Sequence, residues 1–301
     1  MNILTIDKLS KSFGSNKVID NLSFSVPEHS IYGFIGQNGA GKTTTMKIIL
    51  GLLKADAGRV TVCGDAVRFG QTKTNEVIGY LPDVPEFYPY MRPGEYLKLC
   101  GEITGIPADK IRNRSEELLT LVGLEGINKK IGGFSRGMKQ RLGIAQALLN
   151  EPRLLICDEP TSALDPIGRK EILDILLAVK GRVTVVFSTH ILADVERICD
   201  HVAVLNNGRL ALCGTLSELK AKHKADSLLI EFATENDKKK FIALYDRTNY
   251  TQTETTLVIR TDNIAATQIR TLELLAGEKL LPRKLEIAEP TIENLFLEAI
   301  Q

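Results

Sequence analysis

Residues 36–43 read GQNGAGKT, a spacing of glycines, lysine and threonine that suits a chain of phosphates. The glycines let the backbone turn so that successive N–H groups point inward, and the following helix adds the positive end of its dipole. In this pattern Lys42 reaches the β- and γ-phosphates and Thr43 ligates Mg²⁺. The residues predicted to hold the nucleotide are Gly36, Asn38, Gly39, Ala40, Gly41, Lys42, Thr43 and Thr44.

The elements around this loop are those that the pattern requires. An apolar run at 31–35 predicts a strand before it, and a helix is predicted after it with the apolar face Met46, Ile49, Leu50 and Leu53. Chance would give roughly one such loop match per hundred chains of this size. The strand and the helix therefore favour a phosphate site over an incidental glycine turn.

Asp158 and Glu159 follow the apolar run 154–157, where a buried strand would normally avoid charge. Paired acids after a strand more often cap a helix or lie in a solvated turn. With a phosphate loop upstream, we expect Asp158 to hold Mg²⁺ through water and Glu159 to act as a general base on the attacking water.

Residues 132–141 (GGFSRGMKQR) resemble the signature loop and helix of ATP-binding cassette proteins, whose usual form is LSGGQ. Phe134, Arg136 and Met138 depart from that form. The resemblance implies ATP as the ligand, with Ser135 and the Gly137 N–H facing the γ-phosphate held by the opposite subunit. By itself the segment is a helix start capped by serine.

Other matches follow in the order of that family. The resemblance implies that adenine stacks on Phe13, that residues 162–165 cross a dimer interface, and that His190 contacts the γ-phosphate. Alone, Phe13 would be a core residue and His190 a structural one. Asp83 stands where most members have glutamine, and its carboxylate can orient water or ligate Mg²⁺.

Residues 290–296 (PTIENLF) resemble the closing motif of a C-terminal domain found in one exporter branch, which includes bacitracin-type and lantibiotic-immunity exporters. This implies a separate integral-membrane permease and a homodimer or heterodimer of ATP-binding subunits. It also implies a location at the cytoplasmic face of the cell membrane.

The 301 residues are 44% hydrophobic and 25% charged, a composition typical of globular proteins. Their net charge of +1 gives no electrostatic field strong enough to attract nucleic acid. Five scattered cysteines without a CxxC pair predict neither a disulfide framework nor a zinc site. We see no secretory signal and no apolar run of about 18 residues. Because the net charge is so small, nucleic acid is not expected as a partner.

The apolar patterns predict an α/β fold in two domains. Residues 1–216 are predicted to form the nucleotide-binding domain, with a β-rich opening and a helical subdomain at about 84–150. From residue 94 onward apolar residues recur at helical spacing, with charges between them, and are expected to face a core: Leu97, Ile103, Ile111, Leu118, Leu119 and Val122. Residues 217–301 are predicted to form a small α+β accessory domain. The predicted strands are 3–9, 22–26, 31–35, 59–62, 154–157, 183–187, 202–205, 228–233, 255–260 and 284–287, and the helices include 170–179, 191–199, 236–245, 264–276 and 291–300.

Residues 85–92 (PEFYPYMR) place three aromatics and a methionine between two prolines, which does not suit a regular element. Aromatic residues, Met and Arg are enriched at protein interfaces. In the resembled family a short permease helix docks beside this loop. The alternative is that these rings fill the seam between two subdomains.

The predicted function is that of an ATP-hydrolysing transporter subunit that exports a drug, a peptide antibiotic or a similar substrate. One alternative is a cassette ATPase acting on ribosomes or nucleic acid, which typically has tandem cassettes or a long coiled coil. Between Gly36 and Ser135 there is only a short helical insertion. A non-hydrolysing regulator would lack an acid at position 159.

Overall fold

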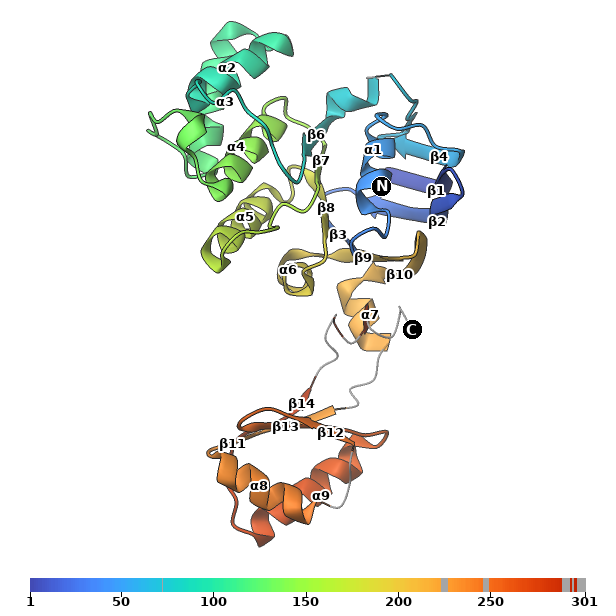
Figure 1. The fold of residues 1–301 in the computed structure, drawn as a ribbon, viewed down its shortest axis with the longest axis vertical. Coiled ribbons are helices and arrows are strands. Elements are labelled where there is room, and N and C mark those ends of the chain that lie inside the picture. Colours follow the sequence, from blue (N-terminus) through green and yellow to red (C-terminus); the bar gives the residue numbers. More distant parts are fainter. Residues whose placement is uncertain (72, 223–226, 246–248, 289–292, 294, 297–301) are drawn as a thin grey trace. The chain divides into compact units, whose positions relative to one another are not determined.

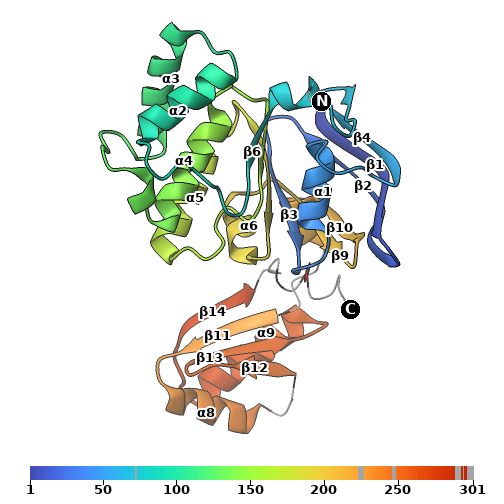
Figure 2. The ribbon, with the colours of Figure 1, turned by 45° about the horizontal axis from the view of Figure 1, so that its top comes forward.

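The computed structural model describes residues 1–71, 73–222, 227–245, 249–288, 293 and 295–296. The chain forms two compact units, Met1–Leu216 and Ser217–Glu298. The larger unit combines two sheets with helices on either side of the parallel sheet, and the smaller unit is one sheet with two helices (Figures 1 and 2).

A six-stranded sheet forms the centre of the larger unit, in the order β10-β9-β3-β8-β7-β6. All its pairs are parallel except β9 with β10, which is an antiparallel edge. Every residue of β3, β7 and β8 is buried, as expected where helices or a second sheet cover both faces. The strands are β3 (Ile31–Gly36), β6 (Ile78–Leu81), β7 (Leu154–Cys157), β8 (Thr184–Thr189), β9 (His201–Asn206) and β10 (Arg209–Thr215).

A second, antiparallel sheet has the order β2-β1-β4-β5. Leu4, Ile6 and Val60 from this sheet pack with Phe34 of β3 and Met46 of the first helix in one apolar core. The helix is therefore enclosed between two sheets, which fixes its first turn at the end of β3. These elements are β1 (Asn2–Phe13), β2 (Asn16–Pro27), β4 (Ala57–Val62), β5 (Asp65–Ala66) and α1 (Lys42–Ile49).

Helices follow β6, β7 and β8 on the other side of the parallel sheet: α2 (Pro93–Ile103), α3 (Ala108–Leu121), α4 (Arg136–Leu148), α5 (Pro166–Val179) and α6 (Leu192–Ile198). Leu97, Ile111 and Leu118 are buried, as the apolar spacing predicts. Ile103 differs, since its side chain is 75% exposed. It lies six residues, or about 240° of helical rotation, from Leu97 and therefore on a different face of α2.

The smaller unit is an antiparallel sheet in the order β12-β13-β11-β14, and α8 and α9 lie on one face of it (Figures 1 and 2). Its core contains Ile230, Phe232, Phe241, Leu257 and Leu275. The elements are α7 (Leu216–Lys222), β11 (Ser227–Phe232), α8 (Glu235–Leu244), β12 (Tyr250–Gln252), β13 (Thr256–Arg260), α9 (Ile264–Gly277) and β14 (Pro282–Ala288).

The predicted fold class is confirmed: an α/β unit with a β-rich part and inserted helices, followed by a small α+β unit. Most of the predicted helix 291–300 and of the motif 290–296 lies outside the described residues. Among the described helices, none is both long and apolar enough to cross a bilayer.

Close packing of α4 on β6 leads to a stability prediction. A Cβ at Gly79 would overlap the carbonyl oxygen of Ala147 and lie 2.9 Å from its carbonyl carbon. Gly79→Ala should therefore lower the free energy of unfolding by about 1–3 kcal/mol, because backbone must shift to admit the methyl group.

Gly94→Ala is the matched control, since a Cβ there meets no atom within 4 Å, and alanine favours the helix. Urea unfolding followed by circular dichroism measures both variants. If Gly79→Ala were as stable as Gly94→Ala, the close approach of α4 to β6 would be wrong.

Candidate nucleotide site

The residues predicted to do chemistry lie at one edge of the parallel sheet. Gly36 ends β3, Asp83 follows β6, Asp158 and Glu159 follow β7, and His190 follows β8. Because β3, β8, β7 and β6 are parallel neighbours, their carboxyl ends meet at the same edge. This edge is where open α/β sheets bind ligands.

The loop between β3 and α1 depends on its glycines. Gly39 and Gly41 have φ angles of +84° and +107°, which residues with a Cβ rarely adopt. A Cβ on Gly41 would also lie 2.9 Å from the carbonyl oxygen of Val18. The loop is therefore closely packed on one side, and its glycines have no side chains that would keep a ligand away from the backbone N–H groups.

The first turn of α1 is built to receive an anion. Gly41 is its N-cap and supplies no side-chain hydrogen bond to the first-turn N–H groups. The side chain of Thr43 is exposed and that of Thr44 is half-buried at this end. A phosphate group can satisfy these N–H groups and gain from the helix dipole.

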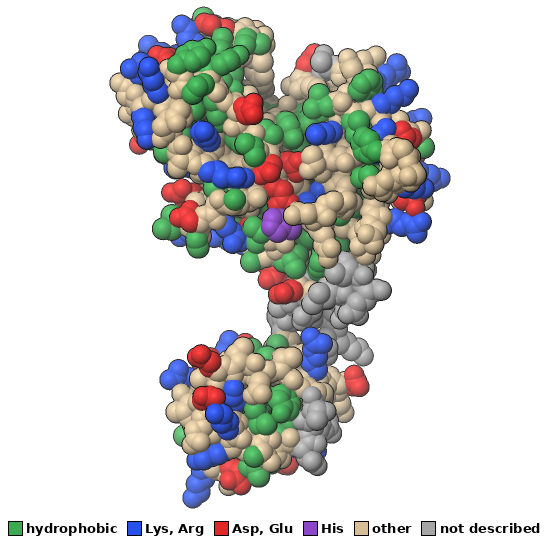
Figure 3. Space-filling view, in the orientation of Figure 1, with side chains coloured by type: hydrophobic (Ala, Val, Ile, Leu, Met, Phe, Trp, Pro, Cys, Tyr) green, Lys and Arg blue, Asp and Glu red, His purple; other side chains and the backbone are tan. Residues whose placement is uncertain are grey.

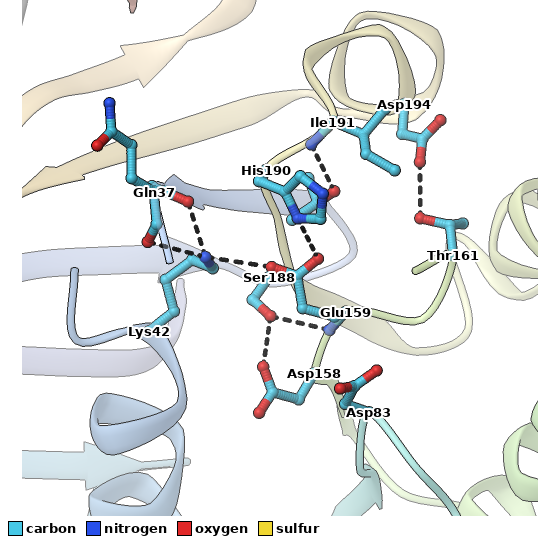
Figure 4. A network of polar contacts seen from close by, with 12 residues as sticks. Gln37, Lys42, Asp83, Asp158, Glu159, Thr161, Ser188, His190, Ile191 and Asp194 are labelled. Carbon is cyan, nitrogen blue, oxygen red and sulfur yellow. Dashed lines mark hydrogen bonds and ion pairs between the residues drawn. The ribbon is translucent and has the colours of Figure 1, made fainter. Parts of the chain in front are cut away.

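Lys42 is a buried cation at the centre of this site. Its side chain is 6% exposed, and Nζ donates to the carbonyl oxygens of Gly36 at 2.7 Å and Gln37 at 3.3 Å. Nζ also lies 3.1 Å from Oε1 of Glu159 (Figure 4). A phosphate chain in the loop would compete with Glu159 for this ammonium group.

Glu159 is held in place from three sides. Its φ of +48° is in the left-handed region, a strain that clusters at functional sites. Its backbone N–H donates to Ser188 Oγ at 2.9 Å, and Oε2 lies 2.9 Å from Nδ1 of His190. The carboxylate therefore lies between Lys42 and His190, as Figure 4 shows.

Ser188 joins the two acids that follow β7. Its Oγ donates to Oδ1 of Asp158 at 2.6 Å and accepts from the N–H of Glu159. Asp158 is 3% exposed, so this hydrogen bond stabilises a carboxylate that has little access to water. Ser188 is not among the residues predicted from the sequence, although a hydroxyl at the end of an apolar strand is a signal that could have found it.

A second buried network, also not foreseen, joins the segments on either side of the site. Asp194, 2% exposed in α6, accepts from Thr161 Oγ1 at 2.7 Å and from Arg169 of α5 at 2.6 Å. Thr161 follows Glu159, and Asp194 follows His190. The network therefore joins the two segments that carry Glu159 and His190 through one buried carboxylate.

Asp83 joins the carboxylates at this edge (Figure 4). Its Oδ1 lies 3.1 Å from the guanidinium of Arg136. Burial raises the pKa of Asp83, and Asp158 and Glu159 act in the same direction, whereas Arg136 and His190 lower it. On the face drawn in Figure 3, acidic side chains gather beside a histidine at the centre of the larger unit.

The remaining predicted site residues lie apart from this cluster. Phe13 ends β1 with its ring 51% exposed and Lys11 Nζ 5.3 Å from the ring centroid, so one ring face can receive a flat ligand. Ser135 caps α4 and accepts from the N–H of Met138 at 3.2 Å. With Gly137 it begins a helix on the opposite side of β6 and β7 from α1 (Figures 1 and 2).

The donor set suits a magnesium nucleotide better than a metal cage made of protein alone. Within the described part of the chain, no group of three or more His, Cys, Asp or Glu residues could hold a metal ion. Mg²⁺ usually takes one or two protein oxygens together with phosphates and water. Thr43 and Asp158 offer such oxygens.

Comparisons with known proteins agree with this geometry. A family profile described as ABC transporter matches residues 19–162. The chain is 35% identical to the bacitracin transport ATP-binding protein BcrA of Bacillus licheniformis, over 99% of this chain and 97% of the relative. It is 30% identical to the linearmycin resistance ATP-binding protein LnrL of Bacillus subtilis, over 98% and 97%.

A solved structure of an ATP-binding subunit of an ABC transporter superposes with a TM-score of 0.66 at 33% identity, over 73% of this chain and 92% of that one. The predicted family and activity class are confirmed by these relatives together with the phosphate loop. The chain belongs to the ATP-hydrolysing, ATP-binding subunits of ABC transporters.

Proposed function

We propose that this chain hydrolyses Mg²⁺-bound ATP between two ATP-binding subunits and thereby drives a separate permease that exports an antibiotic or a similar substrate. The observation that supports it best is the position of Glu159. Its carboxylate lies 3.1 Å from Lys42 Nζ and 2.9 Å from His190 Nδ1 at the mouth of the phosphate loop. A base is thus held beside the group that would bind the β- and γ-phosphates.

In this proposal the residues divide the tasks of phosphate binding and catalysis. Lys42 and the first-turn N–H groups of α1 hold the phosphates, and Glu159 accepts a proton from the attacking water. His190 orients Glu159 through Oε2 and contacts the γ-phosphate. Ser188 keeps Asp158 and Glu159 in a fixed relation, since its hydroxyl bonds to both.

Thr43, Asp158 and Asp83 are the proposed Mg²⁺ residues. Mg²⁺, when bound, neutralises charge on the phosphates and leaving group. Thr43 begins α1 next to Lys42, and Asp158 lies one residue before the proposed base. Asp83 comes from the neighbouring strand end and would orient water or the ion.

The site is proposed to be complete only in a dimer, homomeric or heteromeric. Ser135 and Gly137 begin α4, whose N-terminus has the positive dipole end needed for a γ-phosphate. Because α4 and α1 lie on opposite sides of β6 and β7, we assign these residues to the nucleotide of the opposite subunit. Phe13 would stack on the adenine of its own site.

The partner is proposed to be an integral-membrane permease, which places the chain at the cytoplasmic face of the membrane without a nucleic-acid partner. Residues 1–216 would form the motor, with a helical subdomain at about 84–150, and residues 217–301 an accessory domain. The relatives named for bacitracin transport and linearmycin resistance match nearly the whole chain, so we infer an antibiotic as substrate.

The segment 85–92 is the proposed permease contact. Phe87 packs edge-on against Tyr96 of α2, with the two ring centroids 5.0 Å apart. Tyr88 and Tyr90 differ, because they are 51% and 65% exposed and lie 5.8 Å apart. Two exposed rings side by side suit a protein interface.

Glu159→Gln tests the catalytic assignment. We expect ATP binding to be retained or tightened, because Lys42 loses a competing anion, and hydrolysis to fall by about 10²- to 10⁴-fold. Binding of a fluorescent ATP analogue and release of phosphate are measured on the same preparation. Glu125→Gln, at an exposed position outside the site, is the control. Hydrolysis near the wild-type rate in Glu159→Gln would remove Glu159 from this role.

Mixing two inactive variants tests the composite site. Lys42→Ala removes the phosphate lysine, and Ser135→Arg blocks the start of α4, so each chain alone should hydrolyse little ATP. A mixed dimer has one site with both parts intact, so random mixing restores about a quarter of the sites. Phosphate release is measured before and after mixing. If the mixture stays as inactive as its components, this chain does not form composite homodimers.

Tyr88→Glu with Tyr90→Glu tests the permease contact. The charged side chains should weaken co-purification with the permease and leave ATP binding and the melting temperature unchanged, since both rings are exposed. Phe69→Glu, at another exposed aromatic position, is the matched control. Undiminished co-purification would place the interface elsewhere, and a large drop in melting temperature would show that the rings are core.

A further inference from the structure

Two residues of α4 bind Asp83, one at its backbone and one at its side chain. Nε2 of Gln140 donates to its carbonyl oxygen at 2.6 Å, and the guanidinium of Arg136 contacts its carboxylate at 3.1 Å. Positions 136 and 140 are one helical turn apart and therefore share a face. The helix that begins next to Ser135 is thus joined directly to a strand end of the nucleotide site.

Only one of these two contacts controls the carboxylate. Gln140 is fully buried, and one turn further along a Cβ at Gly143 would lie 2.5 Å from Leu81 Cδ1. The backbone on either side of Asp83 is therefore fixed by packing and by Gln140. The Arg136 and Asp83 side chains are 42% and 47% exposed, so their ion pair sets the direction and charge of the carboxylate without setting the fold.

The two partners are also two of the positions at which this chain departs from the resembled pattern. Asp83 stands in the place of glutamine, and Arg136 stands in the place of a glycine in LSGGQ. One change adds a negative charge and the other a positive charge, so together they leave the local charge unchanged.

A carboxylate at this position that is balanced neither by Arg136 nor by a bound cation would oppose nucleotide binding. Asp83 is close enough to Asp158 and Glu159 for their charges to act on it, and a nucleotide brings further negative charge to the same edge. Lys42 and His190 face Glu159, which leaves Arg136 as the cation in described contact with Asp83.

We propose that Arg136 is a positioning residue for Asp83: it holds the carboxylate against the start of α4 and balances its charge, so that the site accepts a nucleotide with an acid at position 83. The proposal rests on the proposed function of the phosphate loop. It assigns Arg136 a role within its own subunit, toward its own nucleotide, in addition to its place in the signature loop.

A double-mutant cycle in the full-length chain tests this role. Arg136→Gln, Asp83→Asn and the double variant are titrated with a fluorescent ATP analogue and Mg²⁺ at low and high salt. Arg136→Gln should bind the ATP analogue about two- to fivefold more weakly than wild type at low salt. High salt should reduce this difference in affinity between variant and wild type, because it screens the ion pair. The same substitution in the Asp83→Asn background should have almost no effect, because no charge is left uncompensated.

Two controls separate positioning from other causes. Arg136→Lys keeps the charge and should restore most of the affinity, and melting temperatures should stay within a few degrees of wild type. Arg112→Gln removes an 83% exposed arginine elsewhere in the helical part and should bind normally.

Equal losses for Arg136→Gln in both backgrounds would overturn the proposal, since Arg136 would then act directly on the nucleotide or on the helix. No loss in either background would overturn it as well. A wild-type chain that fails to bind the analogue would instead refute the proposed function, which distinguishes the two failures.

Discussion

The parallel pairing of β3, β8, β7 and β6 is the constraint on which the site depends. Each strand ends at the same edge of the sheet and delivers there one part of the machinery: the phosphate loop, His190, the pair Asp158 and Glu159, or Asp83. Gly36 and His190 are 154 positions apart in the sequence, and they lie at the same edge because the carboxyl ends of parallel strands point the same way. The complete burial of β3, β7 and β8 makes this register costly to change, since a slip by one residue would exchange the side chains packed on the two faces of each strand.

The charges that the strands bring to this edge have to be balanced by nearby opposite charges or hydrogen bonds. Three carboxylates and one histidine lie near Lys42 and Arg136. Lys42 pairs with Glu159 and Arg136 pairs with Asp83, while His190 contacts Glu159 and the Ser188 hydroxyl donates to Asp158. Because Lys42 is almost fully buried, water screens its charge little, and its ion pair with Glu159 is correspondingly strong. A buried lysine bonded to Glu159 and to two loop carbonyls is an arrangement that a phosphate chain can replace by competing for the same ammonium group. Ligand binding and release of the Glu159 carboxylate are thereby linked through one side chain.

The sequence sufficed for those parts of the site that are local in the chain. The glycine spacing of 36–43, the acids after 154–157 and the helix cap at Ser135 are each defined by a few neighbouring residues. Contacts across long separations could not be read in this way, which is why Ser188 with Asp158 and Arg136 with Asp83 became visible only in the fold. Short elements were missed for a related reason: β6 has four residues and β12 has three, too few to show a period. Ile103 was misplaced because an apolar residue at the end of α2 fits the composition of a core helix without facing the core.

The contacts of α4 and α6 show how a change at the nucleotide could reach distant segments. Asp83 is fixed to α4 by Gln140 and Arg136, and Glu159 and His190 are each close in sequence to a residue of the Thr161–Asp194 network. A shift of these side chains would therefore act on two elements: α4, which begins after Ser135, and α6, whose Asp194 bonds to Thr161 and to Arg169 of α5. Close packing makes such elements move as units and not deform gradually. The same bonds that hold Asp83, Glu159 and His190 in register thus connect these side chains mechanically to the start of α4 and to α6.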